Sequence, residues 1–589
     1  MNKSKTMMTG AEVLSSILEK ANVKYVFAYP GTSELALCDA IIRNKSIILM
    51  NGRGDKESAF MAAGGSLLNP LNSAAILHGA RGGTNALGAI ADAHRNEVPV
   101  LFIVGLPSTS SQPFLPPHGE WNLIKKLGNF VKYSVEIKDT SPLSARNFCS
   151  AIYKALEICV SYPYGPVIIG FPQDVSEKKW IPKKYISYRK ETGSGKQTYS
   201  KKNINKTIHA INKSNRPVIY IDDFFYKFPR AKEIAKKLAQ LLHAPIFQVF
   251  YGRGPMLFER LTKKVTSHFL GCYNPADSSH QKIMSDADLL ITIEDRNMYP
   301  RVVGQLPDCR KIAITSNPVM TKKNNYLTRN DLVLEGDVGK ILEEIYSKLD
   351  TQDKAKQRTS WYAQNETDSS SPTKTDSKYA FMRTGIAKIL SEVFKKVKSP
   401  ILVDDSQMFG GLLSEGYDLF PSKLRVFGDH GAFIGGGLAL SAGLAKCEPD
   451  ATVFCTLGDQ SFTNAIQGLV SAVQQKIKII YIVCNNSKSV SLMKQILSQD
   501  PTAFDSGKNT FLNNAPINYS ALTKSLKINT YTIPYIPNHT NKSYTHPNTI
   551  FRKSLAQALK TNGPTLIELQ LPSDPDAWKG IWTVKGNEK

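Results

Sequence analysis

Short apolar runs that end in Gly, Pro or Asp recur along this chain, and amphipathic stretches separate them. Runs of this kind, without polar alternation, are typical of strands buried on both faces of a parallel sheet. In the first part of the chain they are residues 74–77, 98–105 and 165–172, with helical patterns at 86–94 and 143–158 between them. The alternation predicts β-α-β units and therefore a doubly wound α/β fold.

The same pattern occurs twice more, and two polar stretches, 178–206 and 350–378, separate the three blocks. The 589 residues are long enough for several cores. We therefore predict three doubly wound parallel-sheet domains, at residues 1–180, 205–350 and 378–589. The middle block has no GxGxxG after its first strand, and the GSGK at 193–196 lacks the context of a phosphate loop.

Composition excludes several classes of protein. The 42% hydrophobic and 21% charged residues are values of a globular chain, and no apolar run is long enough to cross a membrane. The eight cysteines are scattered singly, which indicates reduced core residues. The net charge of +24 is partly concentrated in 178–206, where ten Lys and Arg accompany one Glu, so we expect no nucleic-acid partner. A cytoplasmic protein without membrane contact is the expectation.

Two strand ends in the third block carry side chains suited to a metal ion. One strand ends in Gly458-Asp459-Gln460-Ser461, and the next ends in Asn485-Asn486, with 24 residues between Gln460 and Asn485. The carboxyl ends of neighbouring parallel strands lie at one edge of a sheet. Carboxylate and amide oxygens there suit Mg²⁺ that holds a diphosphate.

With this spacing, the segment resembles the thiamin-diphosphate signature GDG…NN. The resemblance identifies the chain as a member of the superfamily of thiamin-diphosphate-dependent 2-oxo acid decarboxylases and acetolactate synthases. It implies thiamin diphosphate and Mg²⁺ as cofactors, with Asp459, Asn486 and the backbone carbonyl of Lys488 as metal ligands. Gln460 and Lys488 stand where the family commonly has Gly, so side chains occupy positions where backbone usually approaches the ligand.

Further segments match the family's cofactor site. The glycine-rich stretch 431–443 resembles its turn into a helix, where Ile434 takes the place of the residue that bends the cofactor, and 404–406 begins its second diphosphate loop. The cofactor-binding residues that the resemblance implies are Asp405, Ser406, Gly431, Ile434, Gly435, Gly458, Asp459, Gln460, Ser461 and Asn486.

The first block supplies the catalytic carboxylate by the same resemblance. Glu57 lies where the family places the glutamate that activates the aminopyrimidine ring, while the ring chemistry belongs to the cofactor. The family architecture is a pyrimidine-binding, a central and a diphosphate-binding domain, with the active site between the first domain of one subunit and the third of another. It implies a homodimer or homotetramer.

Within the superfamily, residues 29–35 and 77–90 are most similar to the benzoylformate decarboxylases. That match implies a substrate contact for Thr32 and a proton-transfer role for His78. The second histidine of those enzymes is unmatched, since Thr266 stands in its place with His268 two residues on. Loops also carry four polar residues with no distinguishing context: His94, Glu97, His118 and Glu120.

Three functions remain open. The leading one is non-oxidative decarboxylation of a 2-oxo acid. The second is a carboligase, which transfers the decarboxylated fragment to another carbonyl compound as acetolactate synthases do; FAD, which such enzymes bind centrally, is not expected here. The third is a catalytically silent paralogue that acts as a binding protein. Arg81 is a candidate for pairing with a second anionic group on the substrate.

Overall fold

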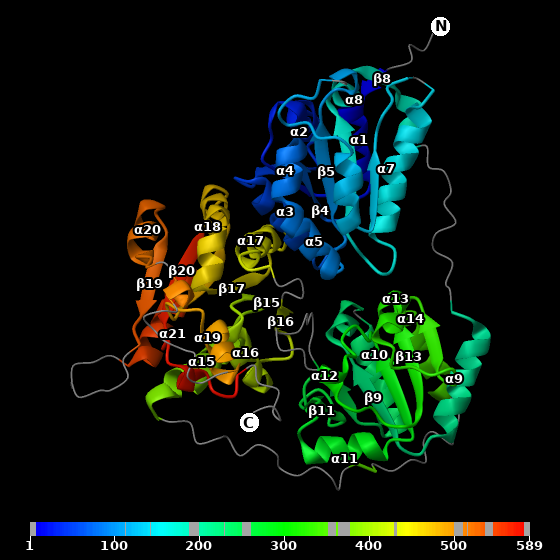
Figure 1. Ribbon diagram of the computed structural model, residues 1–589, viewed down its shortest axis with the longest axis vertical. Helices are drawn as coiled ribbons and strands as arrows, with labels where there is room; N and C mark the ends of the chain where they lie inside the picture. Colours follow the sequence, from blue (N-terminus) through cyan, green and yellow to red (C-terminus); the bar gives the residue numbers. More distant parts are fainter. Residues whose placement is uncertain are drawn as a thin grey trace.

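Three six-stranded parallel sheets form the framework of the molecule (Figure 1). The computed structural model describes residues 7–111, 114–141, 143–187, 199–228, 230–249, 261–350, 361–362, 377–428, 433–499, 510–514, 516–535 and 546–581. The sheets occupy residues 25–172, 217–335 and 400–570, with helices on both faces. The predicted fold class is therefore confirmed, whereas the exact limits of the three domains stay a prediction.

The first sheet reverses its strand order between two neighbouring strands. In spatial order it consists of β3 (Ile48–Asn51), β2 (Tyr25–Ala28), β4 (Ser73–Leu77), β5 (Leu101–Leu106), β7 (Val167–Pro172) and β6 (Tyr133–Glu136). Its helices are α1 (Gly10–Lys20), α2 (Leu35–Arg43), α3 (Asp55–Gly65), α4 (Gly79–Asn85), α5 (Leu87–Arg95), α6 (Leu123–Leu127), α7 (Ala145–Cys159) and α8 (Gln173–Glu177). The chain adds β3 on one side of β2 and the later strands on the other side, which makes the pair β2 and β4 the switch point of the sheet.

The third sheet repeats this order. It consists of β16 (Arg425–Gly428), β15 (Pro400–Asp405), β17 (Thr452–Gly458), β18 (Ile479–Asn485), β20 (Pro564–Gln570) and β19 (Asn529–Ile533). Its helices are α15 (Ile386–Lys396), α16 (Met408–Glu415), α17 (Gly437–Cys447), α18 (Asp459–Gln474), α19 (Val490–Gln499), α20 (Tyr519–Ser525) and α21 (Pro547–Lys560). The switch point lies between β15 and β17.

The central sheet has a different order. It runs β11 (Phe269–Cys272), β10 (Ile246–Gln248), β9 (Pro217–Ile221), β12 (Leu289–Ile293), β13 (Arg310–Thr315) and β14 (Leu332–Glu335). Its helices are α9 (Lys201–Lys213), α10 (Ala231–Leu242), α11 (Ser278–Asp286), α12 (Pro300–Val303), α13 (Pro318–Asn324) and α14 (Val338–Asp350). This is the order of the dinucleotide-binding folds, with its switch point between β9 and β12.

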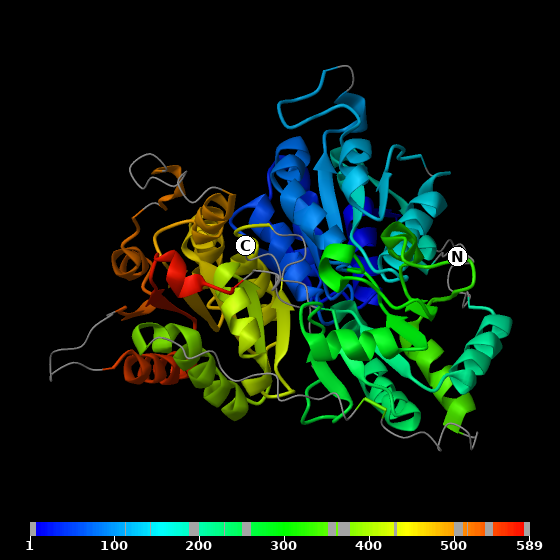
Figure 2. The ribbon, with the colours of Figure 1, turned by 60° about the horizontal axis from the view of Figure 1, so that its bottom comes forward.

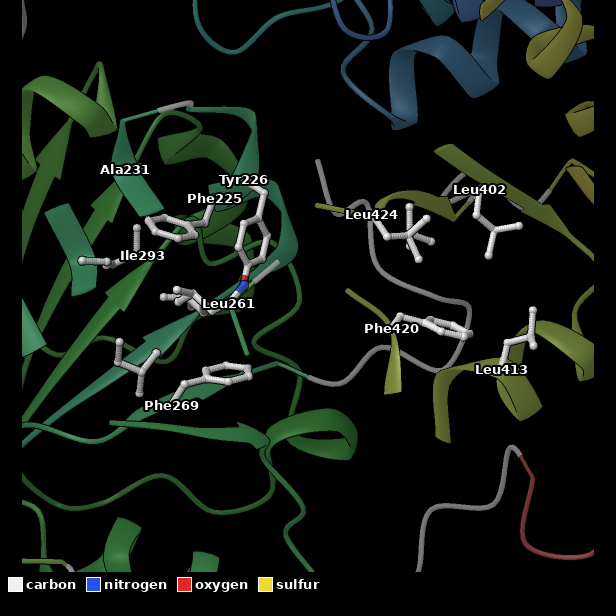
Figure 3. Close-up of a cluster of buried hydrophobic side chains, with 14 of the residues drawn as sticks. Phe225, Tyr226, Ala231, Leu261, Phe269, Ile293, Leu402, Leu413, Phe420 and Leu424 are labelled. Carbon is white, nitrogen blue, oxygen red and sulfur yellow. The ribbon is translucent and has the colours of Figure 1, made fainter. Parts of the chain in front are cut away.

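The three parts of the chain share hydrophobic contacts. One buried cluster contains Phe225 and Phe269 of the central part and also Leu413 and Phe420 of the third part, and Figure 3 shows side chains from both. A second cluster joins the first and third parts. Figure 2 shows the first part beside both of the others, and an ion pair between Glu97 and Arg296 joins the first part to the central one.

Helices α3 and α17 make the closest contact between the first and third parts. A Cβ atom on Gly64 would lie 1.9 Å from the carbonyl oxygen of Leu440, and one on Gly443 would lie 2.0 Å from that of Met61. Each helix therefore needs glycine where it meets the backbone of the other. This contact connects the helix that carries Glu57 to the domain of the predicted diphosphate site.

One strand of a small antiparallel sheet lies in a stretch whose composition is that of a linker. Strand β1 (Met7–Thr9) pairs with β8 (Lys179–Pro182), within 178–206. Trp180 is buried against Phe148, and its ring N–H donates to the carbonyl oxygen of Val175. Burial of this one aromatic side chain thus helps to order a segment whose many lysines indicate a linker. The GSGK segment lies outside the described residues.

Candidate active site

The carboxyl ends of β15, β17 and β18 enclose a cleft at the switch point of the third sheet. The cleft holds about 470 Å³ of space open to solvent. Its lining contains eight of the residues singled out in the sequence: Ser406, Ile434, Gly458, Asp459, Gln460, Ser461, Asn486 and Lys488. Every lining residue lies between 406 and 578. The structure thus brings the sequence motifs of this domain together in one place; Gly431 lies outside the described residues.

Asp459 begins α18 and points its carboxylate into this cleft. Oδ1 accepts hydrogen bonds from the backbone N–H of Gln460 (2.8 Å) and from Nδ2 of Asn514 (2.6 Å), and Oδ2 accepts one from the N–H of Ser487 (2.8 Å). Burial raises the pKa of this carboxyl group above its usual value, and these donors partly offset that effect. These bonds fix the orientation of the carboxylate at the cleft.

Asp405 shapes the glycine-rich turn and does not itself line the cleft. Its Oδ2 accepts hydrogen bonds from the N–H groups of Gly435 (2.9 Å) and Gly437 (3.0 Å), and its Oδ1 accepts one from Oγ of Ser461 (3.1 Å). Gly435 has a φ of +98°, which favours glycine, so the turn before α17 needs this residue. Asp405 is therefore a residue that positions the turn and Ser461.

The two family departures meet at the loop after β18: Lys488 belongs to this loop, and Gln460 lies in the first turn of α18. The carbonyl oxygen of Lys488 accepts a hydrogen bond from the N–H of Val490 (2.9 Å), and Asn486 Oδ1 accepts one from the N–H of Lys488 (3.2 Å). Gln460 Oε1 accepts one from Oγ of Ser489 (3.4 Å). Gln460 therefore contacts this loop, and its side chain helps to form the wall of the cleft.

Two residues of the cleft carry no motif in the sequence. Asn514 reaches Asp459 from a segment 55 positions further along the chain, and Trp578 lines the cleft from the 3₁₀ helix Pro575–Trp578. Trp578 is completely buried, and Lys494 Nζ donates to its carbonyl oxygen (2.9 Å). Only the fold brings these two residues to the strand ends.

Glu57 occupies the first turn of α3 and is almost completely buried, with 1% of its side chain exposed. Neither carboxylate oxygen accepts a hydrogen bond in the described part of the chain, although Lys56 Nζ lies 3.1 Å from Oε1. A buried carboxylate without hydrogen-bond donors is costly, and such groups are typical of ligand sites. In its own chain the loop before α3 runs along α18, where Lys56 Nζ donates to the carbonyl oxygen of Asn464.

The switch point of the first sheet brings together His78 and a residue that the motifs did not reveal. His78 follows β4, and its Nδ1 lies 2.7 Å from Oε2 of Glu34, which follows β2 and is completely buried. Thr32, two residues before Glu34, is exposed. The contact between Glu34 and His78 was in principle predictable, because the two residues follow adjacent parallel strands. Residues 25–28, however, had not been predicted to form a strand.

His118 and Arg81 lie around His78. The ring of His118 stacks on that of His78, with centroids 5.3 Å apart and 30° between the planes. The sequence did not distinguish His118 from a solvated polar residue, so this contact is new. Arg81 is exposed, and its Nε donates to the carbonyl oxygen of Pro117 (3.2 Å). That bond holds the 118 loop against α4, while the substrate role of Arg81 stays a prediction.

The switch point of the central sheet is filled by a buried ion cluster. Arg296, after β12, pairs with Glu97 of the first part through Nε–Oε1 (2.8 Å) and with Glu294 through Nη2–Oε2 (2.6 Å). Lys227 and Asn317 also contact Glu97. Although burial opposes it, the charges of Arg296 and Lys227 hold the pKa of Glu97 at about 2. The sequence left Glu97 without a role; the structure makes it a contact between two domains.

The other central-domain candidate lies elsewhere. His268 comes directly before β11, at the edge of the sheet opposite the carboxyl ends of the strands, and its Nδ1 lies 2.6 Å from the hydroxyl of Tyr362. Thr266 is buried. Neither residue reaches the switch point of its sheet.

A metal ion in this protein would rely on few carboxylates. Among the described residues, no three His, Cys, Asp or Glu side chains come together in a way that could hold a metal. The donor set of the cleft is one buried carboxylate with amide and carbonyl oxygens, which suits a hard cation that keeps water and phosphate ligands. In the same described ranges, no helix is both long and apolar enough to cross a bilayer.

Two family models match the chain. Residues 8–126 match the thiamine pyrophosphate enzyme, N-terminal TPP binding domain, and residues 419–569 match the corresponding C-terminal TPP binding domain. The first match contains Glu34, Glu57 and His78, and the second contains the cleft residues from Ile434 to Asn514.

Curated relatives and solved structures agree with these matches. The mitochondrial acetolactate synthase catalytic subunit of Saccharomyces cerevisiae is 24% identical over 515 residues, 83% of this chain and 72% of that protein. The acetolactate synthase large subunit of Haemophilus influenzae is 24% identical over 529 residues, 86% and 87% of the two chains. A thiamine diphosphate-dependent 4-hydroxybenzoylformate decarboxylase of Rhodococcus jostii RHA1 superposes with a TM-score of 0.74 at 20% identity, covering 96% of this chain and 100% of the other. Benzoylformate decarboxylase of Polynucleobacter necessarius gives 0.74 and 20%, covering 96% and 99%.

Proposed function

Since this chain belongs to the superfamily of thiamin-diphosphate-dependent 2-oxo acid decarboxylases and acetolactate synthases, we propose that it catalyses the non-oxidative decarboxylation of a 2-oxo acid. The observation that carries the proposal is the Glu57 carboxylate, which is buried and accepts no hydrogen bond within the described ranges. A ring nitrogen of the cofactor would supply the missing donor. The matched relatives are enzymes, and this disfavours the silent paralogue.

The cleft of the third domain fits a diphosphate with its metal. When bound, thiamin diphosphate supplies the electron sink for the carbon that loses CO₂. Asp459, Asn486 and the carbonyl of Lys488 would hold Mg²⁺, and the N-terminal turn of α18 presents backbone N–H groups to an anion. The Lys488 carbonyl must then share its lone pairs with Val490. Glu57 would hold a proton at the aminopyrimidine ring.

The active site is proposed to form between two copies of the chain. The described lining of the cleft contains no residue of the first domain, whereas Glu57 belongs to that domain. A second copy that presents its Glu57 to the cleft would complete the site, so a homodimer is the smallest functional unit. The domain limits 1–180, 205–350 and 378–589 and a cytoplasmic location are proposed with it.

His78 favours decarboxylation over ligation. Release of an aldehyde requires one proton at the carbon that has lost CO₂, and an imidazole at the switch point of the first domain can deliver it. The carboligase is the second candidate, because the curated relatives named above are acetolactate synthases. Both reactions use the same residues until CO₂ has left.

Product analysis separates the two. Purified protein with thiamin diphosphate and Mg²⁺ is incubated with pyruvate or benzoylformate, alone and with an aldehyde acceptor, and products are identified by mass spectrometry. We expect CO₂ and an aldehyde, and Glu57→Gln serves as the inactive control. A hydroxy-ketone or acetolactate as the main product would establish the carboligase. No CO₂ from any 2-oxo acid tested would contradict both.

A further inference from the structure

The backbone of the first domain leaves room for a buried Glu34–His78 pair. A Cβ atom on Gly105, in β5, would lie 1.7 Å from Oε1 of Glu34, and one on Gly31 would lie 2.1 Å from Cε1 of His78. Two separate segments therefore carry glycine where the pair needs space. The Glu34–His78 pair therefore belongs to the structure of the switch point between β2 and β4.

The hydrogen bonds of Glu34 fix the state of His78. Glu34 Oε2 accepts from the N–H of Gly31 (3.0 Å) and lies 2.7 Å from His78 Nδ1, and Oε1 accepts from Oγ of Ser33 (2.9 Å). These contacts hold the buried Glu34 side chain against Nδ1 of His78. With Glu34 as the acceptor of the proton on Nδ1, Nε2 of His78 is the nitrogen that exchanges protons. Nε2 forms no hydrogen bond within the described residues.

His118 closes the outer side of this pair. The N–H of Ala80 donates to the carbonyl oxygen of His118 (2.8 Å), and Gly79, with a φ of +47°, leaves space for that carbonyl. The loop is therefore anchored at the start of α4, with the two rings stacked. Burial, then the neighbouring His78, lowers the pKa of His118.

The groups that face His78 come from three elements. They are Glu34 before α2, Asp55 at the start of α3, whose Oδ1 accepts the backbone N–H of His78 (2.9 Å), and His118 in the loop after β5. Burial raises the pKa of Asp55. Glu34 is the only one of the three that bonds the imidazole ring itself.

We propose that Glu34 is the positioning residue that holds the Nδ1 proton of His78, and that His118 passes solvent protons to Nε2 of His78. This inference rests on the proposed decarboxylation. Each turnover converts a 2-oxo acid anion and one proton into an aldehyde and CO₂. The proton leaves His78 Nε2 for the carbon that has lost CO₂, and His118 with a water molecule replaces it. No other reactant is consumed.

The tautomer of His78 tests the first half without turnover. In protein labelled with ¹⁵N histidine, neutral His78 should carry its proton on Nδ1 in the parent and in Glu34→Asp. In Glu34→Gln it should lose that preference, because the amide side chain can donate as well as accept a hydrogen bond. Ser33→Ala, which removes a donor to Glu34 but none to His78, is the matched control. A parent protein with the proton on Nε2, or an unchanged tautomer in Glu34→Gln, overturns the role of Glu34.

The proton supply tests the second half. We expect His118→Gln to lower kcat by about tenfold or more, with added imidazole restoring part of the loss, while His94→Gln, in the same domain, has a small effect. A His118→Gln enzyme with parental kcat and no response to imidazole refutes the relay. If the parent decarboxylates nothing, the proposed function fails, while the tautomer measurement still decides the role of Glu34.

Discussion

The carboxylate of Glu57 is held in its position by the packing of the rest of α3 and by the ion pair with Lys56. It is buried at the start of a helix whose other end meets α17 backbone to backbone. A free energy of desolvation is therefore stored at the residue that the cofactor ring would contact. Proteins often retain such unfavourable groups at functional sites.

Replacing Glu57 by Gln should separate stability from function. The neutral amide removes a buried charge, so we expect the variant without cofactor to melt at a higher temperature than the parent. Binding of thiamin diphosphate should change little, while exchange of its C2 proton falls by about 10²–10⁴-fold, as observed by NMR. Exchange at the parental rate would remove Glu57 from the mechanism.

Replacing Asp459 by Ala should weaken the cofactor itself. Calorimetry should show that Mg²⁺ with thiamin diphosphate raises the Tm of the variant less than that of the parent. Asp450→Ala, an exposed aspartate of the same domain, is the control. Because burial raises the pKa of Asp459, protons compete with the metal at a higher pH than at an exposed aspartate, and the parental shift should shrink as the pH is lowered. Equal shifts in both variants would place the metal elsewhere.

The sequence motifs predicted those cleft residues that lie in or directly after an apolar strand. Gly458 to Ser461 and Asn486 follow directly after long apolar strands, so their common edge could be predicted. Asn514 and Glu34 could not, since each is defined by a side chain far along the chain. Their roles depend on tertiary contacts that spacing does not encode.

Among the elements, the strand ends of the central sheet perform a different task from those of the other two. Here Glu294 and Arg296 leave β12 and join Glu97, which follows α5 of the first domain. Glu97 and Glu294 both have positive φ values, +52° and +58°, so the network holds two side chains in an uncommon backbone conformation. The switch point of this sheet serves to dock one domain on another.

Breaking this network should destabilise the fold strongly. Removing one partner of a buried ion pair costs about 3–5 kcal/mol, so we expect Glu97→Gln and Arg296→Met each to lower the free energy of unfolding by about that amount in urea titrations. Arg230→Met, which removes an exposed pair with Glu343, should cost less than about 1 kcal/mol.

The pH dependence gives a second test of the network. A folded pKa of about 2 for Glu97 means that its contribution is complete above the unfolded pKa of about 4.3 and is lost as the pH falls toward 2. The difference between parent and Glu97→Gln should therefore shrink over that range. A constant difference down to pH 2 would contradict the pairing of an ionised Glu97.

Whether a strand could be predicted from the sequence depended on whether it lies in the interior or at the edge of its sheet. Interior strands such as β5 and β17 are continuous apolar runs, and they were identified. The strands at the sheet edges were not: β6 is half-buried along its length, and β19 mixes Asn and Thr with Tyr and Ile. An edge strand packs on fewer neighbours and needs less apolar surface. The interior strand β2, four residues long, was also missed.

For the molecule as a whole, the proposed shared site makes a complementation test possible. If Glu57 and Asp459 of one active site come from different chains, a mixed dimer of Glu57→Gln and Asp459→Ala contains one intact site and one doubly altered site. Random mixing of the two inactive variants should then restore about one quarter of the parental sites. Sedimentation should show at least a dimer. No recovered activity after verified mixing would place both residues in a single-chain site.

The shared strand order of the first and third sheets bears on the ancestry of the chain. Helices α3 and α17 each follow the second strand of their own sheet, and each presents a glycine to the backbone of the other. Equivalent helices that meet in this reciprocal way are what two identical folded units form about a twofold axis. Such an arrangement is the expected product of duplication and fusion of one ancestral gene, whereas the central domain has a strand order of its own. The carboxylate on one half and the diphosphate cleft on the other would then be two specialisations of one inherited strand-end site.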